Sequence, residues 1–529
     1  MNEILSVKNL EITFHADTNR KHIVVQNMNL SVEKGQMTAL VGASGCGKTI
    51  TALAVAGLLP DTAQITGGSI TVCGHDVLAL KKRERRKLGG SAISMIFQEP
   101  ASSLNPLVPV GRQIAEPLRV HRHFSEKQAY PFVIEAMERA GLPECEKLYS
   151  FFPHQLSGGL CQRVMIALAL ICKPALLIAD EPTTALDACI RYGILEQLKS
   201  ACRETNTSVL FISHDLETIA GLCEKVAVMN NGSIAETNSV REIFIHPRHE
   251  CTKALVLSVP KQEKKIPFCP SGETILEVRD VCRHYGKPAK TALNGVSFSL
   301  RKGEIAGIVG ESGCGKTTLA RCIANLDTAY TGTIRCCGSA PQNREKNTRR
   351  KTAGTIQMIF QNPAQALNPR RTVLQILKEP LYTHRLGTSA ERRAKALDML
   401  RLMELEPEYA DRYPHELSGG QKQRIAIGSA LMLSPDILIA DEAVSALDPP
   451  VQAQILKLLA RLNKTLGISI LFISHNLSVV HSFCDTITVM CRGKIVEQGN
   501  ADDIYFSPQH SYTKHLLAAG KNMLLGKYD

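Results

Sequence analysis

Short aliphatic runs alternate with longer helical stretches along this chain. The runs include ALVG (39–42), GIVG (307–310), LLIAD (176–180) and ILIAD (437–441). Continuous apolar runs of this length are typical of parallel strands buried on both faces. Helical stretches, such as Ser157–Ile171 and Ser418–Leu433, fall between them. The alternation predicts an α/β fold built on open, largely parallel sheets.

The whole pattern occurs twice. IFQEPASSLNP (96–106) matches IFQNPAQALNP (359–369), and LFISHDL (210–216) matches LFISHNL (471–477). Further matches in the same order join VKNLEITF (7–14) to VRDVCRHY (278–285), PHQLSGG (153–159) to PHELSGG (414–420), and LLIADEPTTALD (176–187) to ILIADEAVSALD (437–448). Repeats in one order indicate a tandem duplication. We expect domains at 1–258 and 273–529, joined by a short Lys- and Pro-bearing connector at 259–272.

Composition adds few constraints. The 529 residues carry 62 Lys plus Arg against 50 Asp plus Glu, a net charge of +12. This excess fits phosphate ligands, an anionic membrane surface or nucleic acid about equally. The densest basic runs, 81–87 and 344–351, lack interleaved aromatic residues, so we expect solvated faces there and no nucleic-acid partner.

Membrane spans and disulfides are not expected. No apolar stretch reaches the ~18 residues of a span, and the N-terminus does not read as a signal peptide. The 17 cysteines form no C-x-x-C pair and are interpreted as reduced thiols. Cys269 stands alone in the connector, and its role stays open.

Two glycine-rich octapeptides, GASGCGKT (42–49) and GESGCGKT (310–317), fit G-x-x-x-x-G-K-[ST] and follow aliphatic runs. In this motif backbone N–H groups cradle phosphates, the Lys reaches the terminal phosphates, and the Thr hydroxyl ligates Mg²⁺. One match could arise by chance, but two in register are not a coincidence. The predicted ATP-binding residues are Gly42, Ser44, Gly45, Cys46, Gly47, Lys48, Thr49 and Ile50, and, in the second copy, Gly310, Ser312, Gly313, Cys314, Gly315, Lys316, Thr317 and Thr318.

Acidic pairs end the LLIAD and ILIAD runs. Asp180 and Asp441 are predicted magnesium ligands, because a carboxylate at the end of a buried strand is held in place. Glu181 and Glu442 follow directly and are candidate general bases that polarise water toward a γ-phosphate. A strand-terminal acid that merely caps a turn is the alternative, which recurrence behind each phosphate loop disfavours.

LSGGL (156–160) and LSGGQ (417–421), each after Pro-His, resemble the signature motif of ATP-binding cassette (ABC) ATPases, and the resemblance covers nearly the whole chain. It implies two P-loop domains, each a RecA-like α/β core with an antiparallel β subdomain and an inserted α-helical subdomain, using ATP and Mg²⁺. It also implies site residues beyond the phosphate loops. These are the γ-phosphate-sensing and metal-contacting Gln98 and Gln361, the switch histidines His214 and His475, the adenine-stacking Phe14 and Tyr285, and the signature residues Ser157, Gly158, Gly159, Ser418, Gly419, Gly420 and Gln421.

In this family the signature of one domain grips the nucleotide held by the other. The resemblance therefore implies that the phosphate loop at Lys48 faces Ser418, and that the loop at Lys316 faces Ser157. Leu160 and Ala443 replace the usual Gln and Pro. Neither change removes a phosphate ligand, so both sites are expected to hydrolyse ATP, at rates that need not be equal.

Similar tails (246–260 and 507–519) and x-L-N-P segments resemble the ATPase subunits of oligopeptide, dipeptide and nickel importers. This implies two permease subunits that contact 99–155 and 362–416, an extracytoplasmic solute-binding protein, and a place at the cytoplasmic face of the membrane. The cargo is expected to be peptide-like, with nickel or a metal chelate as the alternative. Soluble tandem cassettes that act on ribosomes are another class, but they carry a long charged linker that this chain lacks. A DNA-repair cassette is expected still less, because the sequence contains no zinc-binding insertion.

Overall fold

The computed structural model describes residues 3–15, 21–183, 188–259, 272–286, 290–337, 354–361, 366–445 and 447–524. Two compact units are present, the first built mainly from residues up to Val259 and the second mainly from residues between 260 and 520. Most of the predicted connector, residues 260–271, lies outside the described residues.

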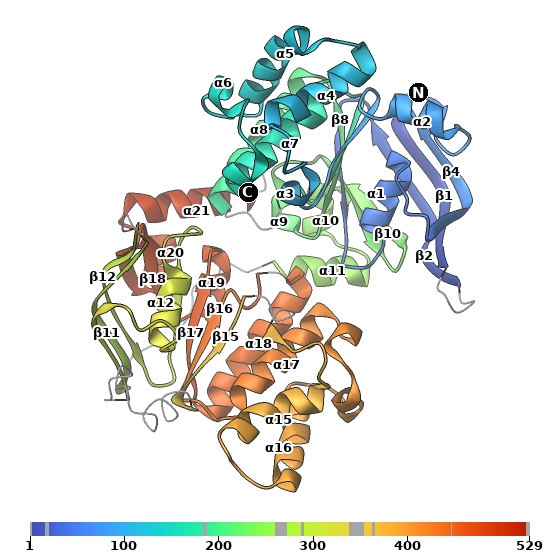
Figure 1. Cartoon of the computed structure of the whole chain (residues 1–529). Helices are drawn as coiled ribbons and strands as arrows, with labels where there is room; N and C mark the ends of the chain where they lie inside the picture. The colour runs from blue at the N-terminus through green and yellow to red at the C-terminus, as the bar shows by residue number, and fades with distance from the viewer. Residues whose placement is uncertain are drawn as a thin grey trace. The chain divides into compact units, whose positions relative to one another are not determined.

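The first unit is organised around a six-stranded sheet with parallel strands at its centre (Figure 1). Its strands, in spatial order, are β10 (Ser233–Ser239), β9 (Lys225–Asn230), β3 (Met37–Val41), β8 (Ser208–Ser213), β7 (Leu176–Asp180) and β6 (Ile93–Ile96). Only β10 pairs antiparallel. All residues of β3, β7 and β8 are buried, which explains their continuous aliphatic sequences.

An antiparallel sheet lies beside this core. Its strands are β2 (Lys21–Glu33), β1 (Glu3–His15), β4 (Ala63–Val72) and β5 (His75–Asp76). Together with α1 (Lys48–Ala56) it covers one face of the six-stranded sheet, where Leu40, Ile178 and Leu210 point.

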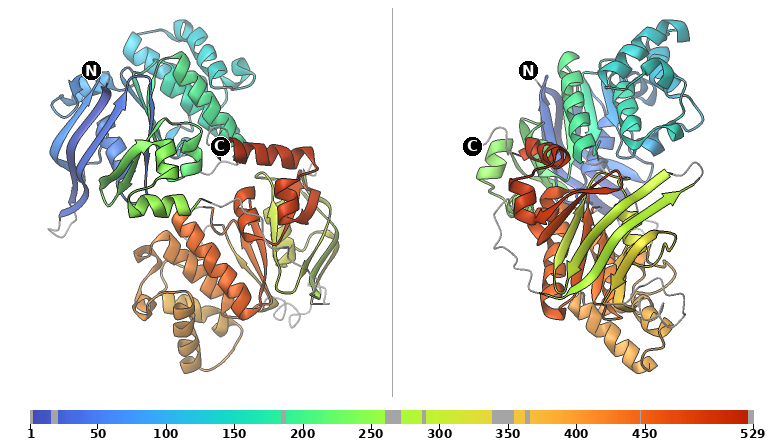
Figure 2. Two further views of the ribbon diagram at one scale, coloured as in Figure 1. Left: turned by 180° about the vertical axis from the view of Figure 1, so that it is seen from behind. Right: turned by 90° about the vertical axis from the view of Figure 1, so that its left-hand side faces the viewer.

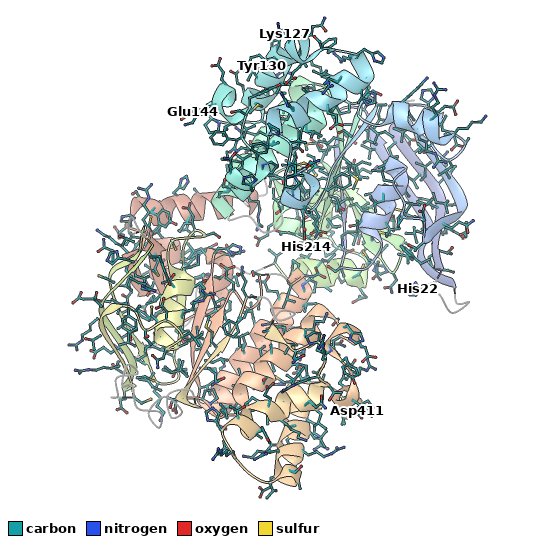
Figure 3. All side chains as sticks on the ribbon, in the orientation of Figure 1. His22, Lys127, Tyr130, Glu144, His214 and Asp411 are labelled. Atoms are coloured by element: carbon teal, nitrogen blue, oxygen red, sulfur yellow. The ribbon has the colours of Figure 1, made fainter. Side chains whose placement is uncertain are left out.

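Helices cover the other face, to which Ala39, Leu177 and Phe211 point. The insertion between β6 and β7 contributes α3 (Pro100–Ser103), α4 (Val110–Arg122), α5 (Glu126–Arg139), α6 (Cys145–Leu148), the 3₁₀ turn η1 (Pro153–Gln155) and α7 (Gly158–Leu170). The remaining helices are α2 (Lys82–Leu88), α8 (Ala188–Glu204), α9 (Leu216–Ala220), α10 (Val240–Ile245) and α11 (Glu250–Leu257). Lys127 and Tyr130 on α5 mark the outer part of this helical group in Figure 3.

The second unit repeats the plan, as Figure 2 shows from two further sides. Its six-stranded sheet runs β15 (Ile356–Ile359), β16 (Ile437–Asp441), β17 (Ser469–Ser474), β13 (Ile305–Val309), β18 (Thr486–Cys491) and β19 (Lys494–Asn500). Its antiparallel sheet contains β12 (Lys290–Arg301), β11 (Thr274–Tyr285) and β14 (Thr331–Cys336).

The helices of the second unit follow the same order. They are α12 (Lys316–Ile323), α15 (Val373–Thr383), α16 (Ser389–Leu402), η2 (Pro407–Asp411), η3 (Pro414–Glu416), α17 (Gly419–Leu431), α18 (Pro449–Leu466), α19 (Leu477–Phe483), α20 (Ala501–Phe506) and α21 (Ser511–Leu524). The two units therefore confirm the predicted α/β fold, with a parallel-centred core, an antiparallel sheet and an inserted group of helices in each. Across the described part of the chain, no helix combines the length and apolarity that a membrane crossing requires.

Candidate active site

The first phosphate loop connects β3 to α1. Gly42 admits no side chain, because a β-carbon there would collide with the carbonyl oxygen of Met229. Gly47 has a φ of 106°, a conformation that favours glycine. The Lys48 ammonium donates hydrogen bonds to the carbonyl oxygens of Gly42 at 2.8 Å and Ala43 at 2.9 Å. The loop thus wraps around its own lysine and leaves backbone N–H groups at the start of α1 for an anion.

The second phosphate loop has the same geometry between β13 and α12. The Lys316 ammonium donates to the carbonyl oxygens of Gly310 at 2.7 Å and Glu311 at 3.0 Å. Gly315 has a φ of 108°. Both lysines are buried, with 6% and 4% of their surfaces exposed, so each positive charge is directed into its loop.

Each loop threonine meets the aspartate at the end of a buried strand. Thr49 Oγ1 lies 3.3 Å from Asp180 Oδ1, and Thr317 Oγ1 lies 3.3 Å from Asp441 Oδ1. Burial raises the pKa of Asp180 to about 6, against the hydrogen bond from Thr49 and the charge of Lys48. The pKa of Asp441 is raised for the same reason.

These oxygen pairs fit a hard divalent cation. A hydroxyl and a carboxylate oxygen are ligands that Mg²⁺ accepts, and a buried carboxylate whose charge is disfavoured by burial gains stability from a nearby cation. Thr49 with Asp180, and Thr317 with Asp441, would hold such a cation in the two units.

Glu181 lies between the predicted glutamine and histidine of its unit. Its φ of 45° turns the chain sharply after β7. Gln98 Nε2 donates to one carboxylate oxygen at 2.9 Å, and His214 Nδ1 lies 2.8 Å from the other. Burial opposes a charge on His214, but the hydrogen bond with Glu181 and the charges of Glu181 and Asp215 outweigh burial and raise its pKa. His214 is labelled in Figure 3.

The second unit repeats this arrangement less tightly. Gln361 Nε2 donates to Glu442 at 2.7 Å, whereas His475 Nδ1 lies 3.6 Å from the nearer Glu442 oxygen. Burial favours a neutral Glu442, but the interactions with His475, Lys316 and Gln361 outweigh it and lower its pKa. A carboxylate that stays ionised in a partly closed site has the properties of a general base.

The signature serines cap the helices that follow them. Ser157 Oγ accepts from the Leu160 N–H at 3.4 Å, and Ser418 Oγ accepts from the Gln421 N–H at 3.3 Å. The Gln421 side-chain oxygen in turn accepts a hydrogen bond from the Ser418 N–H at 2.9 Å. Leu160 has no polar group to do this, so the two helix starts differ, although both expose N–H groups suited to an anion.

The predicted adenine platforms differ as well. Phe14, next to the last residue of β1, is a plain hydrocarbon ring, whereas the Tyr285 hydroxyl donates to Asp327 at 2.7 Å. Arg283 donates to the same carboxylate at 2.8 Å and lies over the Tyr285 ring, 4.2 Å from its centroid. The sequence prediction missed Arg283 and Asp327. Arg283 lies in a segment that recurs in the first copy, but its counterpart there is Ile12, so the repeat gave no sign of its role.

Within each unit the fold thus joins the loop Lys and Thr to the strand-terminal Asp, and the Gln and His to the Glu. The signature serines make their hydrogen bonds at the starts of their own helices. The remaining predicted residues, Gly45, Ile50, Gly313 and Thr318 among them, lie in the phosphate loops or the first turn of the following helix.

The chain is similar to known proteins over most of its length. A family model described as "ABC transporter" matches residues 25–184 and 293–445, which together make up more than half of the chain. The glutathione import ATP-binding protein GsiA of Salmonella choleraesuis is 38% identical over 98% of this chain and 89% of its own length. Its namesake from Escherichia coli O6:H1 is 39% identical with the same coverage.

Proposed function

Because the chain belongs to the ABC transporter family, we propose that its two units supply the ATP hydrolysis that drives an importer of peptide-like solutes. The chain is an ATP-binding cassette ATPase with two cassettes, and it is similar over almost its full length to ATP-binding proteins of import systems. The domain limits 1–258 and 273–529 form part of this proposal.

In each proposed site the Lys and the loop N–H groups bind the terminal phosphates, and Phe14 or Tyr285 stacks on adenine. Glu181 or Glu442 accepts a proton from the attacking water. The neighbouring Gln and His hold the carboxylate of this Glu in orientation. The observation that carries the proposal is the Gln–Glu–His cluster of both units, in which the Gln and the Glu come from segments more than 80 residues apart. Thr49 with Asp180, and Thr317 with Asp441, would hold Mg²⁺, which neutralises developing phosphate charge when bound.

The signature helix starts supply a second anion grip. We propose that Ser157 to Gly159 act on the nucleotide bound at Lys316, and that Ser418 to Gln421 act on the nucleotide bound at Lys48. Two observations support this proposal. A serine caps the first turn of α7 and of α17, where backbone N–H groups are suited to an anion, and the chain belongs to a family that uses its signature motif in this way. One chain would then carry both halves of two composite sites.

Two permease subunits and an extracytoplasmic solute-binding protein would complete the transport complex. This chain would lie at the cytoplasmic face of the membrane. Relatives named for glutathione import support a peptide-like cargo. Nickel or a metal chelate is the alternative cargo for the same machinery.

Separate Glu181→Gln and Glu442→Gln variants test the enzymatic core. General-base catalysis contributes on the order of 10²–10⁴ in rate, so steady-state ATP turnover should fall by at least about tenfold when the more active site is changed, with ATP binding retained. The measurement is phosphate release by the purified chain. Full activity in both variants would refute the assigned base.

Fractionation tests the transport assignment. Tagged chain should co-purify with membranes and with two integral membrane subunits. Recovery with ribosomes and absence from membranes would support the soluble tandem-cassette alternative and overturn the importer.

A further inference from the structure

A cavity of about 80 Å³ opens among the helices of the first unit, away from the nucleotide site. Its apolar walls come from the middle and end of α5, the end of α7 and the end of α8, and they include Phe132, Ala136, Ala140, Ile166, Leu170 and Ala201. The volume exceeds the ~10–15 Å³ that one water molecule needs several times over. Four of the lining residues are alanines (Ala136, Ala140, Ala167 and Ala201), whose small side chains leave the space.

The mouth of the cavity is cationic. Arg122 at the end of α4 and Lys173 just after α7 line it and are exposed. Arg139 also lines it, paired to Glu135 at 2.6 Å and to Glu204 at 3.7 Å. With Glu135 as the single acid among the lining residues, the lining carries two net positive charges.

The second unit carries larger side chains at three of the equivalent positions. Helix α16 matches α5 in length and in its capping box, with Thr388 in the place of Ser125. Arg163 donates to the Ala140 carbonyl at 3.0 Å and Arg424 donates to the Met403 carbonyl at 2.8 Å, so the two helix pairs are held in the same way. Alignment of the repeats then places Met399, Met403 and Leu462 where the first unit has Ala136, Ala140 and Ala201.

The two methionines pack against α17. A β-carbon on Gly428 would lie 3.1 Å from the Cγ atoms of both Met399 and Met403. The charges change too, because Leu402 and Ser434 replace Arg139 and Lys173. The same helical arrangement thus has a cavity with a cationic mouth in the first copy, and two methionines and fewer basic residues at the equivalent positions of the second.

We propose that this first-copy cavity is a binding site for a small hydrophobic carboxylate. The apolar walls take a phenyl ring or a short alkyl chain, whose transfer from water is favourable. The carboxylate stays at the mouth, where Lys173 and Arg122 pair with it. A neutral ligand would leave the cations unused, and an amine would be repelled by them.

Calorimetric titration of the full chain with 3-phenylpropionate tests the site. We expect saturable binding of one ligand per chain with a Kd of roughly 1 mM or below, at least about fivefold tighter than 3-phenyl-1-propanol, and no binding of 3-phenylpropylamine. Absence of saturable binding to about 10 mM, or equal binding of acid and alcohol, would overturn the proposal.

Variants locate the ligand. The double substitution Ala136→Met/Ala140→Met introduces the side chains of the second copy and should weaken binding at least about tenfold. Lys173→Ser, also taken from the second copy and at an exposed position, should weaken carboxylate binding about two- to fivefold with little effect on the alcohol. Lys147→Ser removes the same charge from α6, outside the cavity lining, and is the matched control.

Circular dichroism confirms that each variant is folded. Unchanged affinity in the filled variant would place the ligand elsewhere and refute the site. Equal losses of carboxylate affinity in Lys173→Ser and Lys147→Ser would refute the role of the basic side chains at the cavity mouth. Binding is the readout throughout, so the result does not depend on the proposed ATPase residues or cargo.

Discussion

At the scale of single residues, each of the two phosphate loops contains a cysteine packed next to the loop lysine. Cys46 and Cys314 expose only 8% and 6% of their surfaces. A β-carbon on Gly42 would meet the Cys46 sulfur at 2.8 Å, and the Lys48 ammonium lies 3.9 Å from that sulfur. An adduct on either thiol therefore has no room unless the loop opens.

Alkylation of both loop cysteines should abolish ATP turnover, and bound ATP should slow the reaction. Burial, opposed by Lys48, raises the pKa of Cys46, so labelling should be slower than at exposed Cys337 and should accelerate with pH. Peptide mapping after N-ethylmaleimide treatment, paired with ATPase assays, measures both effects. A Cys46→Ala/Cys314→Ala variant is the control and should resist inhibition. Full activity with both thiols verifiably labelled would contradict this account.

The residue chemistry of the site was largely predictable. Lys48, Thr49, Asp180 and their counterparts belong to short motifs, and the structure brings Thr49 to Asp180 and Thr317 to Asp441 at 3.3 Å. The roles assigned to them stay predictions. The Tyr285–Asp327–Arg283 network was not predictable, because those side chains meet only through the pairing of β11 with its neighbours and the turn after α12.

At the scale of elements, α9 of the first unit carries an unusual acid. Glu217 lies one residue into this short helix, beside Asp215, which caps it, and Arg191 of α8. Its Oε1 is buried and has no hydrogen-bond partner among the described residues. Burial and the charge of Asp215, opposed by Arg191, raise the pKa of Glu217 to about 8. The second copy has Ser478 at this position.

This carboxyl should make the first unit less stable as pH rises. The folded state keeps the Glu217 proton up to about pH 8, whereas an unfolded chain releases it near pH ~4.3. The protonated Glu217 carboxyl therefore contributes its full stabilisation below the pKa of the unfolded chain. This stabilisation is lost as the pH rises through the pKa of Glu217 in the folded state. Glu217→Gln should remove this loss and stabilise the protein at pH 8.5 by on the order of a few kcal/mol, with little effect near pH 5.

Chemical denaturation of wild type and Glu217→Gln at both pH values measures the difference, and Glu217→Ser supplies the residue of the second copy. A stability gap that stays constant from pH 5 to 8.5 would show that Glu217 is not protonated in the folded protein.

The elements themselves followed closely from sequence. The predicted helix at Ser157–Ile171 is α7, with Ser157 as its N-cap, and the predicted helix at Ser418–Leu433 is α17, with Ser418 as its N-cap. The first-copy cavity was not foreseen, because alanine on a helix face is compatible with both close packing and an open space. Only the positions of α5, α7 and α8 decide between them.

At the scale of the whole molecule, the composite-site proposal makes a pairing prediction. If Lys48 shares its nucleotide with Ser418, then Lys48→Ala and Ser418→Arg disable the same site. Their combination should retain one occluded nucleotide per chain, as each single variant does. Lys48→Ala with Ser157→Arg should retain none, since it damages both sites.

Occluded ATP is counted per chain in a Glu181→Gln/Glu442→Gln background, in which turnover is blocked. The reverse outcome, loss of both nucleotides from Lys48→Ala/Ser418→Arg and retention of one in the other pair, would show that each unit closes its own site.

The amino-acid sequence alone determined the duplication, the fold class and the phosphate-binding chemistry, because buried strands, glycine turns and helix starts are specified by neighbouring residues. Only the tertiary structure decided which groups meet across long separations. It brought Gln98 and His214 to Glu181, anchored Tyr285 through Asp327, and left the first copy hollow where the second is packed with methionine. Those outcomes depend on how separate elements fill shared space, which no local pattern records.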